Sequence, residues 1–290
     1  MSAIVAVAQP VSVTDDRGRQ ISLPRPAQRI VTLAPHLTEL AFSAGAGSRL
    51  AGVARFSDFP PAARELPQIG DSALMDFERI VALKPDLILA WKSGNAPADV
   101  ERLEQLGYRV FVSEPARLAD VPRLLRSIGT LAGTLPEAAH AAADFEREIR
   151  MLRERFAKAP KVRVFYAIWR KPLMTVNGAH LISDVIAMCG GENVFAGIRQ
   201  LTPVVTLEAV IAAKPQGVLG GSDPAGGNTY AAEWRAFAPA PLRELPVFYI
   251  NPDLIQRPTH RIVDGARAVC AALEQIRSHR EDTARPAKSS

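Results

Sequence analysis

Residues 134–159, TLPEAAHAAADFEREIRMLRERFAKA, decide the fold of this chain of 290 residues. Alanine, glutamate, arginine and leucine dominate the stretch, and they are the strongest helix formers. Thr134 and Glu137 have the spacing of a capping box, and Pro136 falls in the first turn, where proline is tolerated. Its large apolar residues recur at helical spacing and are Phe145, Ile149, Leu152 and Phe156. The stretch predicts one continuous helix of about 32 Å.

The two flanks of this helix contain copies of one helix–strand unit. Residues 77–91 read FERIVALKPDLILAW, and residues 207–221 read LEAVIAAKPQGVLGG. The matching residues are Glu78 and Glu208, Ala82 and Ala212, Lys84-Pro85 and Lys214-Pro215, and Leu89 and Leu219. Because proline cannot continue a helix, each copy is predicted to be a short helix followed by a buried strand.

Similar alternation of short helices and apolar strands extends along both flanks, and it indicates mostly parallel sheets covered by helices. The sequence therefore predicts an α/β fold of two Rossmann-like lobes joined by a single long backbone helix, with a ligand cleft between the lobes. The predicted parts are a residual signal peptide or disordered end (1–10), an N-terminal lobe (11–133), the connecting helix (134–159), a C-terminal lobe (160–277) and a disordered tail (278–290).

Composition and charge are those of a soluble globular protein. Apolar residues make up 48% of the chain and charged residues 22%. The net charge is +5, but the basic residues are spread along the chain, so a solvated surface is favoured over nucleic-acid binding. No apolar run reaches the about 18 residues that a membrane-spanning helix requires.

The N-terminus and the cysteines indicate export. Residues 4–8 are apolar, and Ala6-Val7-Ala8 matches the A-x-A pattern of a signal cleavage site. The basic region is missing and the apolar run is short, so we favour a truncated export signal over a plain disordered end. We therefore expect a soluble protein of the periplasm. For an exported protein, the two cysteines, Cys189 and Cys270, are best interpreted as a disulfide, and two buried free thiols are the alternative.

Candidate binding residues lie in the loops that follow the predicted strands, because open α/β sheets bind ligands outside the carboxyl ends of their strands. Trp91 directly follows an apolar strand, and the polar residues Lys92-Ser93-Gly94-Asn95 come next. We therefore expect its ring to face a cleft, where it would suit a flat apolar ligand, although core packing is the alternative. Other strand-end residues are Pro35-His36, Phe56, Trp169-Arg170, Gly220-Gly221 and residues 251–257.

Catalysis has little support in the sequence. G-x-S-x-G, P-loop and H-E-x-x-H motifs are all missing, so we assign no catalytic residue, no metal site and no cofactor. His36, His180 and His260 could meet with Asp253 as a transition-metal set, but solvated or hydrogen-bonded loop histidines are favoured. A metal-dependent enzyme that uses the predicted cleft remains the less favoured alternative.

Five stretches resemble the periplasmic substrate-binding proteins of ABC importers with a helical backbone (class III), which carry cobalamin, siderophores, haem and metals. They are RIVTLAPHLTELAFSAG (29–45), FSDFP (56–60), ERIVALKPDLILAWKSGN (78–95), CGGENVF (189–195) and RIVDGARAVCAAL (261–273). AWKSGN and CGGENVF are most similar to the cobalamin branch. The resemblance implies a monomer that captures a corrinoid (cobalamin, vitamin B12) and delivers it to an inner-membrane permease. The alternative ligand is haem or a ferric siderophore, with His36 as a possible iron ligand.

The resemblance also implies roles for individual residues. Trp91 stands at a cobalamin-stacking tryptophan, and Phe56 stands where the family has a tyrosine. Asp253 and Arg257 match residues that hydrogen-bond corrin amide side chains, and Cys189 and Cys270 match the family's disulfide. The departures from the family pattern, for which Trp169 is expected to compensate, are Ser72 and Thr202 in place of aromatic residues, Leu254 in place of an aromatic residue and Gln256 in place of a glutamate.

Glu78 and Glu208 occupy the same position in the two copies of the repeat. A carboxylate near the start of a helix interacts favourably with the helix dipole, which is the simpler explanation. The resemblance implies a further role, because one glutamate on each lobe of these proteins pairs with arginines of the permease subunits. We favour docking, since helix stabilisation alone does not require glutamate in both copies.

Overall fold

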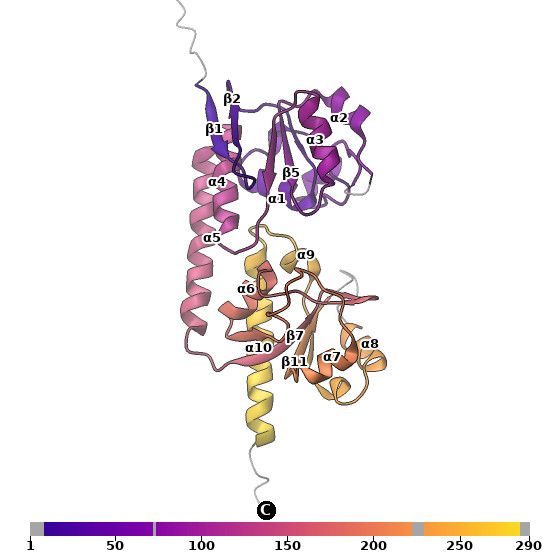
Figure 1. The fold of residues 1–290 in the computed structure, drawn as a ribbon. Coiled ribbons are helices and arrows are strands. Elements are labelled where there is room, and N and C mark those ends of the chain that lie inside the picture. The colour runs from indigo at the N-terminus through magenta and orange to yellow at the C-terminus, as the bar shows by residue number, and fades with distance from the viewer. Residues whose placement is uncertain (1–8, 72–73, 222–228, 285–290) are drawn as a thin grey trace, which may run out of the picture. The chain divides into compact units, whose positions relative to one another are not determined.

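The computed structural model describes residues 9–71, 74–221 and 229–284 and contains two compact units (Figure 1). The N-terminal unit consists of Met1–Pro115 and Ala119–Glu146, and the C-terminal unit consists of Ala116–Leu118 and Arg147–Ser290. The predicted export signal and Ser72 lie outside the described residues. Each unit has its own sheet, which agrees with the predicted α/β fold.

The predicted connecting helix is α5, Leu135–Phe156, and the division between the units falls within it. Phe145, Ile149 and Phe156 are buried on its apolar face, whereas Leu152 is only half-buried. Just before α5, the Thr134 hydroxyl donates a hydrogen bond to the carbonyl oxygen of Ala44, 2.6 Å away. The start of this helix is thereby joined to the residue that follows α1.

The N-terminal unit is built on a parallel sheet with the strand order β4-β3-β5-β6. Its strands are β3 (Ile30–Thr32), β4 (Leu50–Val53), β5 (Leu87–Trp91) and β6 (Val110–Ser113). An antiparallel hairpin of β1 (Val11–Thr14) and β2 (Gln20–Leu23) precedes the sheet. The strands are short apolar runs because helices cover both faces of such a sheet.

The helices of this unit connect successive strands. They are α1 (Pro35–Ser43), α2 (Phe77–Leu83), α3 (Pro97–Gln105) and α4 (Asp120–Ala132), with short 3-10 turns at Gly47–Arg49 and Pro61–Glu65. Ile80 of α2 and Leu103 of α3 are fully buried in one apolar cluster with Ile88 of β5. In Figure 1, α2 and α3 lie together on one side of the sheet, and α1 packs against α4.

The C-terminal unit has a second parallel sheet, with the order β10-β7-β11-β12. Its strands are β7 (Val162–Ala167), β10 (Gly191–Asn193), β11 (Gly217–Gly220) and β12 (Val247–Tyr249). Two very short strands, β8 (Trp169–Arg170) and β9 (Leu173–Met174), pair separately in antiparallel fashion. The helices are α6 (Leu181–Met188), α7 (Leu207–Ala212), α8 (Tyr230–Phe237), α9 (Pro252–Ile255) and α10 (Ile262–Ala284), with a 3-10 turn at Leu242–Glu244.

The structure confirms the predicted repeat. A side chain caps each helix, since Asp76 accepts a hydrogen bond from the Arg79 amide and Thr206 accepts one from the Ala209 amide. The lysine of each Lys-Pro pair has a left-handed backbone, with φ of 47° at Lys84 and 50° at Lys214. Both copies therefore end their helix and enter their strand through the same backbone conformation.

Several local predictions differ from the structure. His36, which we placed in a loop, lies in the first turn of α1, because Pro35 at the first helical position has a φ suited to the helix. The expected loop 251–257 contains α9, which the Asn251 side chain caps by accepting a hydrogen bond from the Asp253 amide. The last helix, α10, continues to Ala284, beyond residue 278, where we placed the start of a disordered tail.

The predicted disulfide is present. It joins Cys189, directly after α6, to Cys270 within α10, and both residues are buried. Because the two cysteines are 81 positions apart, the bond closes most of the C-terminal unit into one covalent loop. Across the described residues, no helix combines the length and the apolar composition required to span a bilayer.

Candidate ligand-binding site

A pocket of about 280 Å³ lies at the carboxyl ends of the strands of the N-terminal unit. This is the edge at which open α/β sheets bind ligands. The residues that line it include Pro35, Arg55, Phe56, Asp71, Trp91 and Asn95. The structure therefore places two of the predicted contact residues, Phe56 and Trp91, in one pocket.

Trp91 is the last residue of β5, and its side chain is half-buried. The ring of His36 meets the Trp91 ring at an interplanar angle of 85°, with the ring centroids 5.1 Å apart. His36 is only 4% exposed and packs against the tryptophan. The geometry therefore supports a role for His36 in holding the ring, in addition to its predicted role as a ligand residue.

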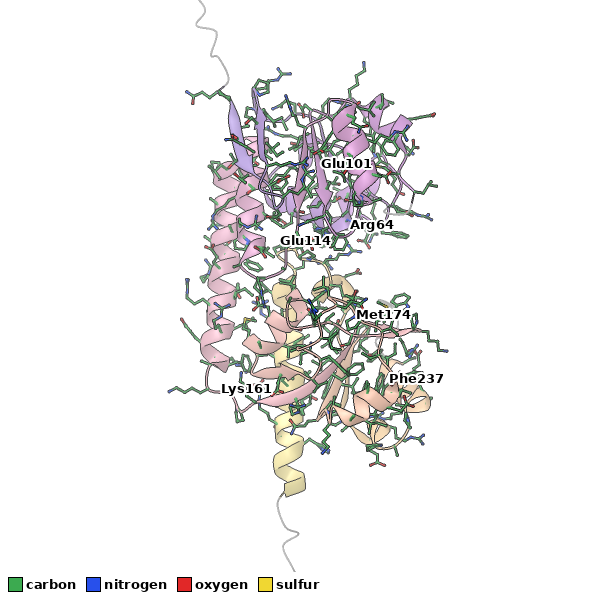
Figure 2. All side chains as sticks on the ribbon, in the orientation of Figure 1. Arg64, Glu101, Glu114, Lys161, Met174 and Phe237 are labelled. Carbon is green, nitrogen blue, oxygen red and sulfur yellow. A yellow bond between two sulfur atoms is a disulfide. The ribbon has the colours of Figure 1, made fainter. Side chains whose placement is uncertain are left out.

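The loop after Trp91 controls the position of this ring. The Asn95 side chain accepts a hydrogen bond from the Trp91 amide at 2.7 Å and donates one to the Leu33 carbonyl oxygen at 3.0 Å. A Cβ atom on Gly94 would lie only 1.8 Å from Cε3 of Trp91, so the ring lies directly against the backbone of this residue. Glu114, labelled in Figure 2, accepts hydrogen bonds from the amide and hydroxyl of Ser93.

Phe56 is presented to the pocket by an unusual backbone conformation. Its φ is 67°, a left-handed value that costs energy for any residue other than glycine, and its side chain is 63% exposed. The next residue, Ser57, is held by a chain of buried hydroxyl groups. Its hydroxyl forms a hydrogen bond of 2.9 Å with the Thr38 hydroxyl, which forms one of 2.7 Å with the Thr32 hydroxyl. This buried hydroxyl chain was not predicted, although all three residues lie in or next to strand-end segments.

In the C-terminal unit, Trp169 lies in β8 and not in a loop, and it is 50% exposed. It pairs with Met174 of β9, which is labelled in Figure 2, and Met174 forms an antiparallel bridge with Val204. Val204 is 61% exposed. Trp169 and Val204 are therefore exposed apolar residues on segments that both pair with Met174, and only Trp169 was predicted.

Asp253, in α9, and Arg257, four residues later in the chain, form an ion pair of 2.9 Å. Both side chains are largely buried, at 25% and 17% exposed. Gln256, between them, donates a hydrogen bond to the Gly221 carbonyl oxygen at 3.2 Å, just beyond the end of β11. The structure therefore brings together the polar residues predicted in segment 251–257 and places them beside a strand end.

Two buried tyrosines near the same strand ends were not predicted. Tyr230 lies so close to the end of β11 that a Cβ atom on Gly220 would be 2.4 Å from its hydroxyl. Burial raises the pKa of Tyr166 and of Tyr230, so both phenols stay neutral at physiological pH. They can therefore act as neutral hydrogen-bond donors.

His180, one residue of the metal set that the sequence did not favour, has a structural role. His180 caps α6, because its Nδ1 accepts a hydrogen bond from the Ile182 amide at 3.1 Å, and burial lowers its pKa to about 4. Within residues 9–71, 74–221 and 229–284, no group of three or more His, Cys, Asp or Glu side chains is arranged to hold a metal ion.

Glu78 and Glu208 are exposed second residues of α2 and α7. Hydrogen bonds from its own backbone amide and from Thr206 lower the pKa of Glu208, as expected at a helix start. Helix stabilisation is therefore supported for Glu208, and the equivalent placement of both carboxylates leaves the docking prediction in place.

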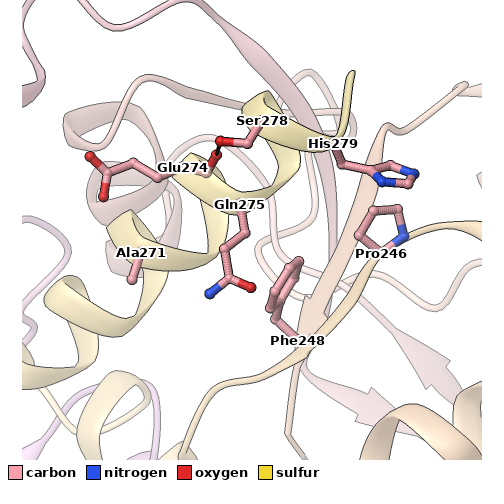
Figure 3. Close-up of a pocket in the computed structure, with 7 residues that line it drawn as sticks. All are labelled: Pro246, Phe248, Ala271, Glu274, Gln275, Ser278 and His279. Carbon is pink, nitrogen blue, oxygen red and sulfur yellow. Dashed lines mark hydrogen bonds between the residues drawn. The ribbon is translucent and has the colours of Figure 1, made fainter. Parts of the chain in front are cut away.

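A second pocket, of about 590 Å³, lies between β12 and α10 (Figure 3). Its lining includes Pro246 and Phe248 from the strand segment and Gln275 and His279 from the helix. Pro246 precedes β12, so this pocket is at the amino end of the strand, opposite the edge that binds ligands in such sheets. We do not assign the ligand to it.

Comparisons with known proteins agree with this description. Residues 30–233 match the model of a family described as periplasmic binding protein. The vitamin B12-binding protein of Vibrio parahaemolyticus is 35% identical over 255 residues, which cover 88% of this chain and 92% of that protein. The crystal structure of the periplasmic vitamin B12 binding protein BtuF of Vibrio cholerae is 33% identical, with a TM-score of 0.78, and covers 87% of this chain and 98% of that one.

Likeness in fold extends further than likeness in sequence. The periplasmic heme-binding protein RhuT from Roseiflexus sp. RS-1 has a TM-score of 0.76 but only 20% identity, over 86% of this chain and 99% of that one. At this identity the comparison shows the fold alone.

Proposed function

This chain belongs to the family of periplasmic binding proteins, and we propose that it captures a corrinoid of the cobalamin type and delivers it to an inner-membrane ABC permease. The observation that carries the proposal is the half-buried Trp91, held at the pocket of the N-terminal unit by Gly94 and Asn95. A rigid aromatic surface at a strand end suits a large flat ligand. The similarity to vitamin B12-binding proteins over most of the chain supports the same ligand.

The proposed ligand residues are Phe56, Trp91 and His36 of the N-terminal unit, and Trp169, Asp253 and Arg257 of the C-terminal unit. The aromatic side chains would supply apolar contact, and the Asp253–Arg257 pair would supply a hydrogen-bond acceptor and donors. We assign the protein no catalytic step, no resident cofactor and a monomeric state. Its role would be to bind, protect and hand over the ligand unchanged.

Haem is the alternative ligand, because heme-binding proteins share the fold. His36 is the residue that would coordinate the iron, but it is buried and its ring packs against Trp91. Coordination of haem by His36 would require this contact to open. The corrinoid is therefore the better supported ligand.

Calorimetric titration of the purified protein with cyanocobalamin and with haemin tests the proposal. We expect binding heat with cyanocobalamin at micromolar protein, and no chemical change in the recovered corrinoid. Binding of haemin alone, together with its loss in His36→Ala, would overturn the corrinoid assignment in favour of haem.

Replacing both Glu78 and Glu208 by alanine is expected to leave corrinoid affinity within about twofold and to reduce transport about tenfold or more. The reason is that charged residues at the rim or core of a protein interface contribute mainly to recognition of the partner. Transport by the reconstituted permease, with ligand titration and thermal melting in parallel, measures the effect.

The double variant Glu101→Ala, Glu244→Ala is the matched control, since it also removes one exposed glutamate from each unit. Normal transport by the Glu78, Glu208 variant at physiological salt would show that these residues are helix-start charges only.

A further inference from the structure

A charged pair, Arg55 and Asp71, lines the N-terminal pocket together with Phe56 and Trp91. Arg55 follows β4, and its backbone amide donates to the Gly70 carbonyl oxygen at 2.7 Å, which holds the two segments side by side. Oδ1 of Asp71 accepts a hydrogen bond from the Leu74 amide at 3.0 Å. The backbone therefore fixes both residues at the rim of the pocket.

The two charges form a long and exposed ion pair. Nη1 of Arg55 is 3.9 Å from Oδ2 of Asp71, beyond hydrogen-bond distance, and the Arg55 side chain is 60% exposed. An exposed ion pair of this kind contributes little to stability. The pair is nevertheless oriented, because the Arg55 guanidinium lies 5.1 Å from the centroid of the Phe56 ring.

The chemistry of the pair matches one ligand group in particular. A guanidinium offers only donors and a carboxylate offers only acceptors. A primary carboxamide has both a carbonyl oxygen and an NH₂ group, so it can accept from Arg55 while it donates to Asp71. A carboxylate in the same place would gain the Arg55 contact but would face the like charge of Asp71.

We propose that Arg55 and Asp71 form a carboxamide-binding subsite that selects a side-chain amide of the ligand over the corresponding acid. The inference rests on the proposed function, since corrinoids carry carboxamide side chains around the ring. Phe56 and Trp91 then supply apolar contact, and the charged pair recognises an amide at the ligand's edge. Arg55→Gln removes the charged donor, and Asp71→Asn replaces the anionic acceptor while keeping an oxygen for the Leu74 amide.

The test is calorimetric titration with cyanocobalamin and with each isomer in which one side-chain amide has been hydrolysed to a carboxylate. We expect the unaltered protein to bind at least one of these acids about tenfold more weakly than cyanocobalamin, on the scale of one charge-assisted hydrogen bond. Asp71→Asn should remove the difference in affinity between cyanocobalamin and that isomer. Arg55→Gln should weaken the binding of cyanocobalamin about tenfold.

Arg79→Gln is the matched control, because Arg79 is an exposed arginine of the same unit that does not line the pocket. Arg79→Gln should leave unchanged the affinity for cyanocobalamin and the affinity for the acid isomer. If the unaltered protein binds cyanocobalamin while Arg55→Gln and Asp71→Asn change neither affinity nor the preference for amide over acid, the subsite is wrong and the proposed function stands. If the unaltered protein binds no corrinoid, the proposed function and the subsite both fall.

Discussion

Trp91→Ala is expected to weaken corrinoid binding by about 1–3 kcal/mol, which is about 5-fold to 150-fold in the dissociation constant. The loss follows from the removal of a large aromatic surface that lines the pocket at the end of β5. Trp91→Phe should lose less, because it keeps an aromatic face of smaller area. Calorimetric titration with cyanocobalamin measures the dissociation constants of the unaltered protein, Trp91→Ala and Trp91→Phe.

Gly94→Ala provides the control for this interpretation. A Cβ atom at residue 94 would overlap the Trp91 ring, so the alanine should displace the ring and weaken binding about tenfold. In the Trp91→Ala background the overlapping ring is gone, and the same substitution should cost almost nothing further. If Gly94→Ala weakens corrinoid binding equally in both backgrounds, Gly94 acts independently of Trp91. If Trp91→Ala itself leaves the affinity unchanged, Trp91 does not contact the ligand.

Removal of the Cys189–Cys270 disulfide is expected to lower the free energy of unfolding by about 4–5 kcal/mol. The bond closes a loop with a sequence separation of 81, and in the chain-entropy model a loop of this length restricts the unfolded chain by that amount. The melting temperature should fall by about 10 °C or more in Cys189→Ser, Cys270→Ser. Denaturant and thermal unfolding of the two proteins, with the disulfide verified by mass spectrometry of non-reduced peptides, measure the change.

Reductant gives a second route to the same comparison. It should destabilise the unaltered protein and leave the double serine variant unaffected, since that variant has no cysteine. If the free energy of unfolding differs by less than about 1 kcal/mol between the oxidised and the reduced protein, the entropic explanation of the stabilisation is contradicted. Such a result would indicate that the unfolded chain is already restricted by residual structure.

The repeat illustrates what could be predicted from local sequence. Each copy has a polar cap, an apolar helix, a Lys-Pro break and an apolar strand, and every one of these signals acts within a few residues. In the first copy, the structure confirms the predicted helix as α2, Phe77–Leu83, and the predicted strand as β5, Leu87–Trp91. Trp91 was predicted to lie at the pocket for a similar reason, because parallel strands present their carboxyl ends at one edge.

The short elements could not be predicted in this way. β8 and β9 have two residues each, and β10 has three, so none of them contains enough alternation to indicate a strand. β10 becomes a strand only because β7 provides its hydrogen-bonding partner. The four-residue helix α9 depends in the same way on the Asn251 cap.

The sequence by itself determined the two α/β units, the connecting helix and the strand-end position of Trp91, because each depends on composition, spacing or chain order. It favoured the disulfide over two free thiols, and the structure decided between them. Only the tertiary structure decided which side chains meet. His36 reaches Trp91 across 55 residues of sequence, and Arg55 approaches Asp71 only because Gly70 binds the backbone of Arg55. Such contacts are set by how strands and loops pack side by side, and no periodicity along the chain encodes them.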